Sequence, residues 1–287
     1  MIRLISAELF KLRKRAMTRV LLFVLVGIIV ILYLLLLAVS KVTLPVHGSE
    51  EVGAIQNLLG LPVALPFAFS ILSSFGSVLA VILIASSVGN EYNWRTIRTM
   101  LICSESRFKL LVAKLISAGT FILIGMVVGL ATGFVMSLIT TAIGGYAFDF
   151  SFATSGYLWD QFLQFWRTFY ILIPYVLLGF LFSIVGRSAM PGIALGIGVF
   201  FLESIITTFM ILAGGWIAKI PQYLLAANVR AINALSGLPQ NVGMGFGGSN
   251  AFNQTPGVTH AFLTLAIYSL VFVIIAFYLF RKRDVTH

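Results

Sequence analysis

Six long apolar runs dominate this sequence, and each is about as long as the ~20 residues that cross a bilayer as a helix. They cover residues 18–40, 62–88, 110–143, 169–185, 191–212 and 261–280. Because 60% of the 287 residues are hydrophobic and only 10% are charged, the chain has too little polar surface to cover a water-soluble globule. We therefore expect an all-α integral membrane protein with six transmembrane helices, forming a single domain over residues 1–287. The third run is longer than the hydrocarbon core is thick, so it should tilt, bend or protrude.

The basic residues gather in the connections on one side of these runs. With the amino terminus inside, fifteen of the nineteen Lys and Arg residues lie on the inner side, and the outer side holds Lys41, Arg167, Lys219 and Arg230. Such an excess marks the cytoplasmic side, so both termini are expected in the cytoplasm. The net charge of +10 sits in short clusters beside apolar runs, which favours anionic membrane lipids over nucleic acid as the partner.

The first sixteen residues have an amphipathic pattern. Apolar residues recur at spacings of three and four, as Ile2, Ile5, Leu9, Leu12 and Ala16. Arg3, Lys11, Lys14 and Arg15 occupy the other side. This periodicity predicts a helix over residues 1–16 that lies in the membrane interface.

The outer connections are expected at 41–61, 144–167 and 213–260. In the longest one, the apolar residues Ile220, Leu224, Leu225, Val229 and Ile232 have helical spacing but are interrupted by Pro221. Since proline breaks a helix interior, we expect one or two short helices at the outer interface.

One carboxylate lies inside a predicted span. Glu203 shares a helical stripe with Gly192, Gly196, Val199 and Thr207, which predicts a small and polar face packed closely against protein. Two roles stay open for Glu203 and Thr207: a polar contact on a transport path, or a structural packing contact. A serine stripe in the second span, Ser70, Ser73, Ser74 and Ser77, is expected to pack closely or to line a pathway.

The inner connection over residues 89–109 carries the densest charge pattern. Trp94, Ile97 and Leu101 share one helical face, whereas Arg95 and Arg98 point elsewhere. The pattern fits a short surface helix that presents charge to a soluble partner, and equally a solvated basic loop beside anionic lipid.

Motifs for chemistry within the chain are missing from the sequence. It has no G-x-x-x-x-G-K-[ST] loop to hold nucleotide phosphates. His47, His260 and His287 are far apart and lack the spacing of metal ligands. We therefore expect no catalytic residues, no metal site and no cofactor in this chain.

The basic amino-terminal helix and the inner connection also resemble a known family. The connection has the form E-x-x-x-x-T-x-R-x-x-L followed by Ser-Arg and then Lys. Its residues are Glu91, Thr96, Arg98, Leu101, Ser106, Arg107 and Lys114. This order is similar to that of ABC transporter permeases of the ABC-2 type, the type V exporter-like family, and the resemblance covers nearly the whole chain.

The resemblance implies a permease subunit of an ATP-driven exporter in a bacterial or archaeal cytoplasmic membrane. It implies short re-entrant helices between spans five and six, and an amino-terminal elbow helix. The implied partners are separate ATP-binding subunits, which hold ATP and Mg²⁺, and a second permease copy, identical or different. The implied ATPase-coupling residues are Glu91, Arg95, Arg98 and Arg107. A secondary transporter and a membrane-embedded assembly factor remain as alternatives.

Overall fold

The computed structural model describes residues 1–41, 61–93, 107–144, 153–236 and 256–282. Within these ranges every regular element is a helix. The order is α1 (Ile2–Lys14), α2 (Ala16–Lys41), α4 (Leu61–Asn93), α6 (Arg107–Gly144), α7 (Ser155–Gly186), α8 (Ala189–Ala213), the 3-10 helix η1 (Ile217–Tyr223), α9 (Leu225–Asn233), the 3-10 helix η2 (Ala234–Ser236) and α10 (Val258–Lys282). Six of them, α2, α4, α6, α7, α8 and α10, are long and apolar enough to cross a membrane. The six predicted spans are therefore confirmed.

One boundary differs clearly from the sequence prediction. The fourth span begins at Ser155, so most of the expected outer connection 144–167 is the first four turns of α7. Thr154 starts this helix, because its Oγ1 accepts a hydrogen bond from the Tyr157 N–H at 3.3 Å. A hydropathy search misses these turns because they contain polar residues. Two of these residues, Gln164 and Thr168, are nevertheless buried against protein.

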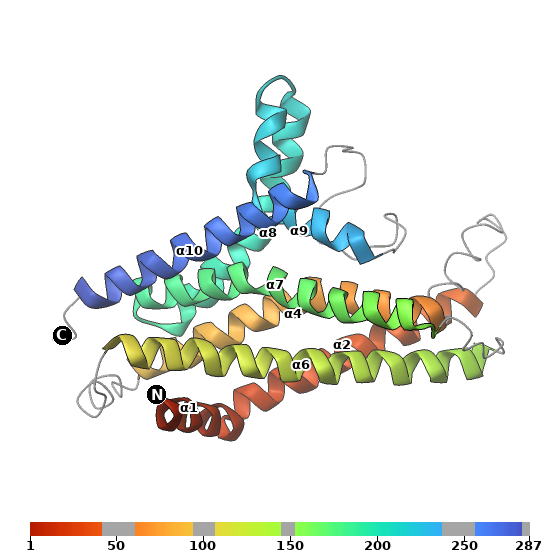
Figure 1. The fold of residues 1–287 in the computed structure, drawn as a ribbon, viewed down its shortest axis with the longest axis horizontal. Coiled ribbons are helices and arrows are strands. Elements are labelled where there is room, and N and C mark those ends of the chain that lie inside the picture. The colour runs from red at the N-terminus through yellow and green to blue at the C-terminus, as the bar shows by residue number, and fades with distance from the viewer. Residues whose placement is uncertain (42–60, 94–106, 145–152, 237–255, 283–287) are drawn as a thin grey trace.

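α6 is much longer than a membrane is thick. Its 38 residues rise about 57 Å at ~1.5 Å per residue, against a hydrocarbon core of ~30 Å. It runs the whole length of the bundle in Figure 1. Parts of α6 must therefore lie outside the hydrocarbon core or tilt within it.

α4 is the centre of the bundle. It packs against α6, α7 and α8, and more lightly against α2 (Figure 1). In the most apolar window of each helix, 72% of the residues of α4 are buried, compared with 17% in α2 and 11% in α10. The outer helices thus present most of their apolar surface outward, as expected where lipid is the solvent.

Small residues let the helices approach α4 closely. A Cβ atom on Gly133 of α6 would lie 2.7 Å from the Cβ of Ala68, and one on Gly196 of α8 would lie 2.6 Å from Val81 Cγ1. The buried positions of α8 are Ala189, Gly192, Gly196, Glu203 and Thr207. The predicted small and polar face of this helix is therefore confirmed in its packing.

A helical hairpin projects from the bundle. Gly214 and Gly215 have φ values of 67° and 62°, a conformation that glycine adopts without strain. They turn the chain so that η1 returns along the end of α8, at the top of Figure 1. The segment contains short helices as predicted, but Pro221 lies inside η1 and the break falls at the extended Leu224, which separates η1 from α9.

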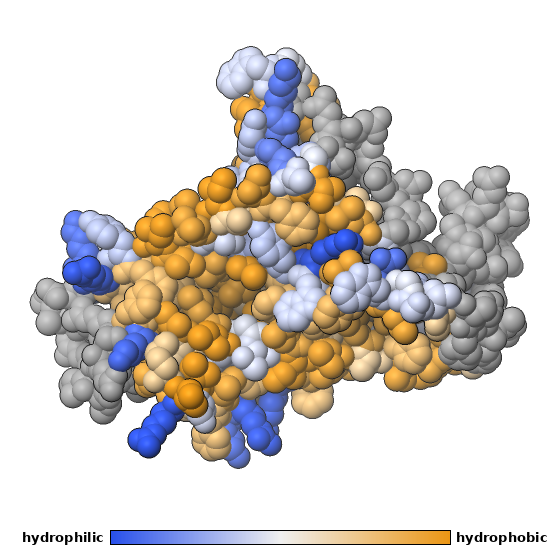
Figure 2. Space-filling view, viewed as in Figure 1, coloured by the Kyte–Doolittle hydropathy of each residue, from blue (hydrophilic) through white to orange (hydrophobic). Residues whose placement is uncertain are grey.

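The surface divides into apolar and polar zones. Figure 2 shows an apolar middle, with hydrophilic side chains around α1 and at the carboxyl end of α10. Arg281 and Lys282 lie in the last turn of α10, and Lys11, Arg13 and Lys14 lie in the last turn of α1. The two helices therefore place basic residues at the same end of the bundle (Figure 1).

The close contact at Gly196 yields a matched test. We expect Gly196→Ala to lower the free energy of unfolding by about 1–3 kcal/mol, because its methyl group would overlap Val81. Gly198→Ala, in the same helix, meets nothing within 4 Å and should be neutral, or stabilising by up to ~1 kcal/mol through helix propensity. Reversible unfolding in sodium dodecyl sulfate measures both. Equal effects of the two substitutions would contradict close α4–α8 packing.

Candidate functional site

Five charged residues meet where α1, α4 and α6 come together. We call Glu8, Lys11, Arg15, Glu91 and Lys114 the ion cluster. Glu8 and Lys11 lie on α1, Arg15 joins α1 to α2, Glu91 lies in the last turn of α4, and Lys114 lies in the second turn of α6. The cluster therefore ties the amino-terminal helix to two transmembrane helices at one end of the bundle.

Lys114 is the central cation of the ion cluster. Its Nζ lies 3.0 Å from Glu8 Oε2 and 2.5 Å from Glu91 Oε2. Lys11 pairs with Glu8, and its Nζ lies 3.3 Å from Glu91 Oε1. Arg15 places Nη2 3.5 Å from Glu91 Oε1 and donates from Nη1 to the Ser87 carbonyl oxygen at 3.2 Å. Each carboxylate thus has more than one cationic partner.

The centre of the ion cluster lies away from water. The side chains of Lys114, Glu91 and Glu8 are 2%, 1% and 5% exposed. Burial would raise the pKa of Glu8, but the charges of Lys114 and Lys11, together with their hydrogen bonds, outweigh burial and lower the pKa below its usual value. Glu8 therefore stays ionised at neutral pH. A buried ion that loses its partner is strongly unfavourable, so the network resists separation of α1 from α4 and α6.

The face of α1 that packs against protein overlaps the predicted apolar stripe only in part. Glu8 and Leu12 are buried, whereas Ile2 is 84% exposed and Phe10 is 62% exposed. The packed side is rotated from the predicted apolar stripe because Glu8 pairs with Lys114. This pairing was not predicted. The sequence did contain one indication of this pairing, because Glu8 is the one acidic residue among the first 49 residues.

The predicted coupling residues separate into two groups. Glu91 is 0% exposed and lies inside the ion cluster, so its carboxylate points into the protein and not outward. Arg107 begins α6, and Arg95 and Arg98 lie outside the described residues. The resemblance named Glu91 and Lys114 together, and the structure brings them into contact. An ATPase-coupling role for the four residues stays a prediction.

Glu203 caps a neighbouring helix. Its Oε1 accepts a hydrogen bond from the Ala226 N–H at 2.8 Å, at the second residue of α9. The N-cap residue of α9, Leu224, has no side chain that could do this. The first N–H groups of a helix lack partners within it and attract negative charge. Glu203 therefore supplies from α8 the acceptor that α9 lacks.

Further side-chain bonds hold α9 in place. Asn228 donates to the carbonyl oxygens of Gln222 and Leu224 at 3.0 and 2.7 Å. Asn233, at the far end of α9, donates to Ser73 Oγ of α4 at 3.1 Å. These contacts favour the structural role for Glu203, and they place Ser73 of the serine stripe in helix packing.

Thr207 makes a hydrogen bond within its own helix. It is buried, and its hydroxyl donates to the Glu203 carbonyl oxygen one turn earlier at 2.7 Å. A place for Glu203 or Thr207 on a transport path stays a prediction. Among the described residues, no three His, Cys, Asp or Glu side chains come close enough to hold a metal ion.

The cap makes a prediction for Glu203. Glu203→Leu removes the acceptor, so the amides of α9 should exchange with solvent faster, by about fivefold for a loss of ~1 kcal/mol. Glu203→Gln keeps an acceptor oxygen at the same position and should cost much less. Hydrogen exchange of the 225–233 segment, followed by mass spectrometry, measures both. Faster exchange in neither variant would contradict the cap.

The ion cluster can be tested with a double-mutant cycle. Glu8→Gln and Lys114→Met each remove one partner of a buried charge, so each should lower the free energy of unfolding, by up to about 3–5 kcal/mol. The double substitution should cost less than the sum, with a coupling of about 0.5–3 kcal/mol. Unfolding in sodium dodecyl sulfate provides the four values. Additive effects would show that the contact contributes nothing.

A family model and a relative each match most of this chain. The family model described as "Protein of unknown function (DUF2705)" matches residues 51–286. The chain is also similar to "Uncharacterized protein YhcI" of Bacillus subtilis (strain 168), with 27% identity over 220 residues that cover 73% of this chain and 64% of that protein. The chain therefore matches less than two thirds of that relative's length. Because the family match extends over most of the sequence, this chain belongs to the DUF2705 family.

Proposed function

We propose that this chain is the permease subunit of an ABC exporter of the ABC-2 type. In this proposal it lies in a bacterial or archaeal cytoplasmic membrane with both termini in the cytoplasm. It pairs with a second permease copy and with separate ATP-binding subunits, which hold ATP and Mg²⁺ and carry out the hydrolysis. The chain itself is then not an enzyme.

The observation that carries the proposal is the ion cluster. Glu91 lies in the last turn of α4 and Lys114 lies near the start of α6, so the cluster joins the two helix ends between which the basic inner connection runs. The same residues fix α1 through Glu8. A force applied to that connection would reach α1, α4 and α6 together, because Lys114 of α6 pairs with carboxylates of both α1 and α4. This is the property that a coupling element needs.

The burial of Glu91 refines its proposed role. A carboxylate that is 0% exposed does not meet an ATPase directly, so Glu91 acts as a positioning residue that orients the connection. Direct contact with the ATPase then falls to Arg95, Arg98 and Arg107. In the proposal, α1 is the elbow helix at the inner interface, where its exposed Ile2 and Phe10 meet lipid.

The outer side of the proposed exporter contains the segment from η1 to η2. These short helices return toward the bundle, and α9 is held by Glu203 and Asn233. We assign them as the re-entrant helices implied by the family resemblance. Their apolar side chains, such as Leu225 and Ile232, are buried against α7 and α10, which suits a segment that dips into a membrane.

The decisive experiment is purification of the tagged chain from its native host in mild detergent. We expect a soluble protein with a phosphate-binding loop to co-purify, and the complex to hydrolyse ATP with vanadate sensitivity. Arg98→Glu should reduce the co-purified ATPase while the chain still inserts in the membrane. Lys219→Glu reverses an exposed charge on η1, at the opposite end, and serves as the matched control. Recovery of the wild-type chain without an ATPase would refute the proposal.

A further inference from the structure

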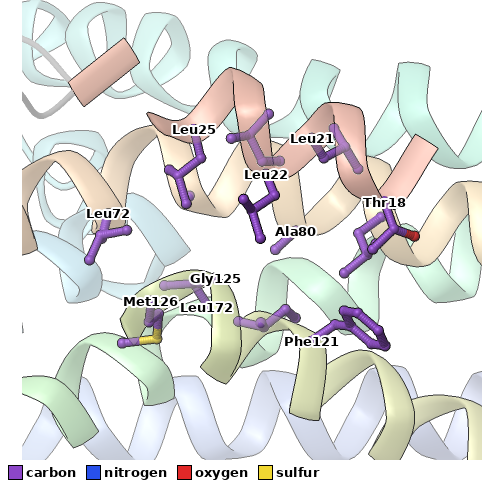
Figure 3. A pocket seen from close by; sticks show the side chains of 14 residues that line it. Thr18, Leu21, Leu22, Leu25, Leu72, Ala80, Phe121, Gly125, Met126 and Leu172 are labelled. Atoms are coloured by element: carbon purple, nitrogen blue, oxygen red, sulfur yellow. The ribbon is translucent and has the colours of Figure 1, made fainter. Parts of the chain in front are cut away.

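An apolar cavity of about 70 Å³ lies between α2, α4 and α6. Figure 3 shows it as a slot with Thr18 and Phe121 toward one end and Leu72 and Met126 toward the other. α2 contributes Thr18, Leu21, Leu22 and Leu25. Of the fourteen lining residues, Thr18 is the one with a polar side chain, and the slot is partly open to the surroundings.

The cavity has space that the protein does not fill. A Cβ atom on either lining glycine, Gly76 or Gly125, would meet nothing closer than 3.9 Å. Gly129, one turn beyond Gly125, would meet Leu72 Cδ2 at 2.7 Å. An apolar cavity stays dry and takes apolar ligands, and an empty one loses dispersion contacts along its walls. A hydrocarbon chain is the occupant that a membrane supplies.

Positive charge lies next to one end of the slot. Thr18 is three residues after Arg15 of the ion cluster and is followed directly by Arg19, which is exposed. Arg13 and Lys14, at the end of α1, are exposed as well. The ion cluster itself holds three cations and two carboxylates. This end of the cavity is therefore electrostatically suited to an anionic headgroup.

We propose that the slot is a binding site for one anionic phospholipid. One acyl chain fills the space between α2, α4 and α6, and the phosphate lies near Thr18 and Arg19. The lipid would then complete the packing of α2, because only 17% of the residues in its most apolar window are buried by protein. The site is independent of the exporter proposal, because it needs neither an ATPase nor a transported substrate.

The test uses phosphatidylglycerol with a photoactivatable diazirine in one acyl chain, added to the full-length chain in mild detergent. After illumination, mass spectrometry locates the labelled residues. We expect labels on α2, α4 and α6 around Leu22 and Gly125. Gly125→Leu fills the slot and should abolish this labelling, whereas Gly119→Leu, on the same helix where a Cβ meets nothing within 4 Å, should retain it.

A second substitution that fills the slot controls for misfolding of the Gly125→Leu variant. Leu22→Trp enlarges a half-buried lining residue of α2 and should also abolish the labelling, with the variant still monodisperse by size exclusion. Labelling that persists in both filling variants, or that is spread equally over the outward faces of α8 and α10, would overturn the site.

The headgroup preference is tested separately. Arg19→Gln should weaken competition by unlabelled phosphatidylglycerol about fivefold, the equivalent of ~1 kcal/mol per basic residue near a charged surface. Unlabelled phosphatidylcholine with the same acyl chains should compete poorly with the wild-type chain. Equal competition by the two lipids would overturn the assignment of an anionic lipid.

Discussion

The pairing of Lys114 with Glu8 and Glu91 is the interaction on which the arrangement of α1, α4 and α6 at this end of the bundle depends. A lysine that is 2% exposed is tolerated in an apolar bundle only if carboxylates compensate its charge. Since those carboxylates come from α1 and α4, the charge requirement fixes which face of α1 turns inward. It also fixes where α4 ends relative to the start of α6.

Along the rest of the bundle, the helices are held together by close packing at small residues. Lipid tails are as apolar as leucine side chains, so helices in a membrane associate through close contact more than through the hydrophobic effect. Gly133, Gly179 and Gly196 permit that approach to α4. The segment from η1 to η2 follows a third rule, in which an N–H group at the start of α9 donates to a carboxylate from another helix. Glu203 and the carboxylates of the ion cluster thus have structural partners.

Much of the architecture was predictable from the sequence because the period and length of apolar runs are local properties. The six apolar helices follow from them. The start of α7 did not, since its first turns carry Gln164 and Thr168, which are polar yet buried. For the candidate site, the resemblance pointed to Glu91 and Lys114, whereas Glu8 and Arg15 were recognised only in the fold.

The sequence by itself determined that this is an all-helical chain with six spans, because a run of about twenty apolar residues satisfies its backbone in lipid only as a helix. The tertiary structure alone decided the partners of the charged residues. Glu8 and Lys114 are 106 positions apart, and Glu203 is 23 positions from Ala226. No spacing rule relates such residues. Their contacts arise from the packing of α1 on α6 and of α9 on α8, where each buried charge requires a partner.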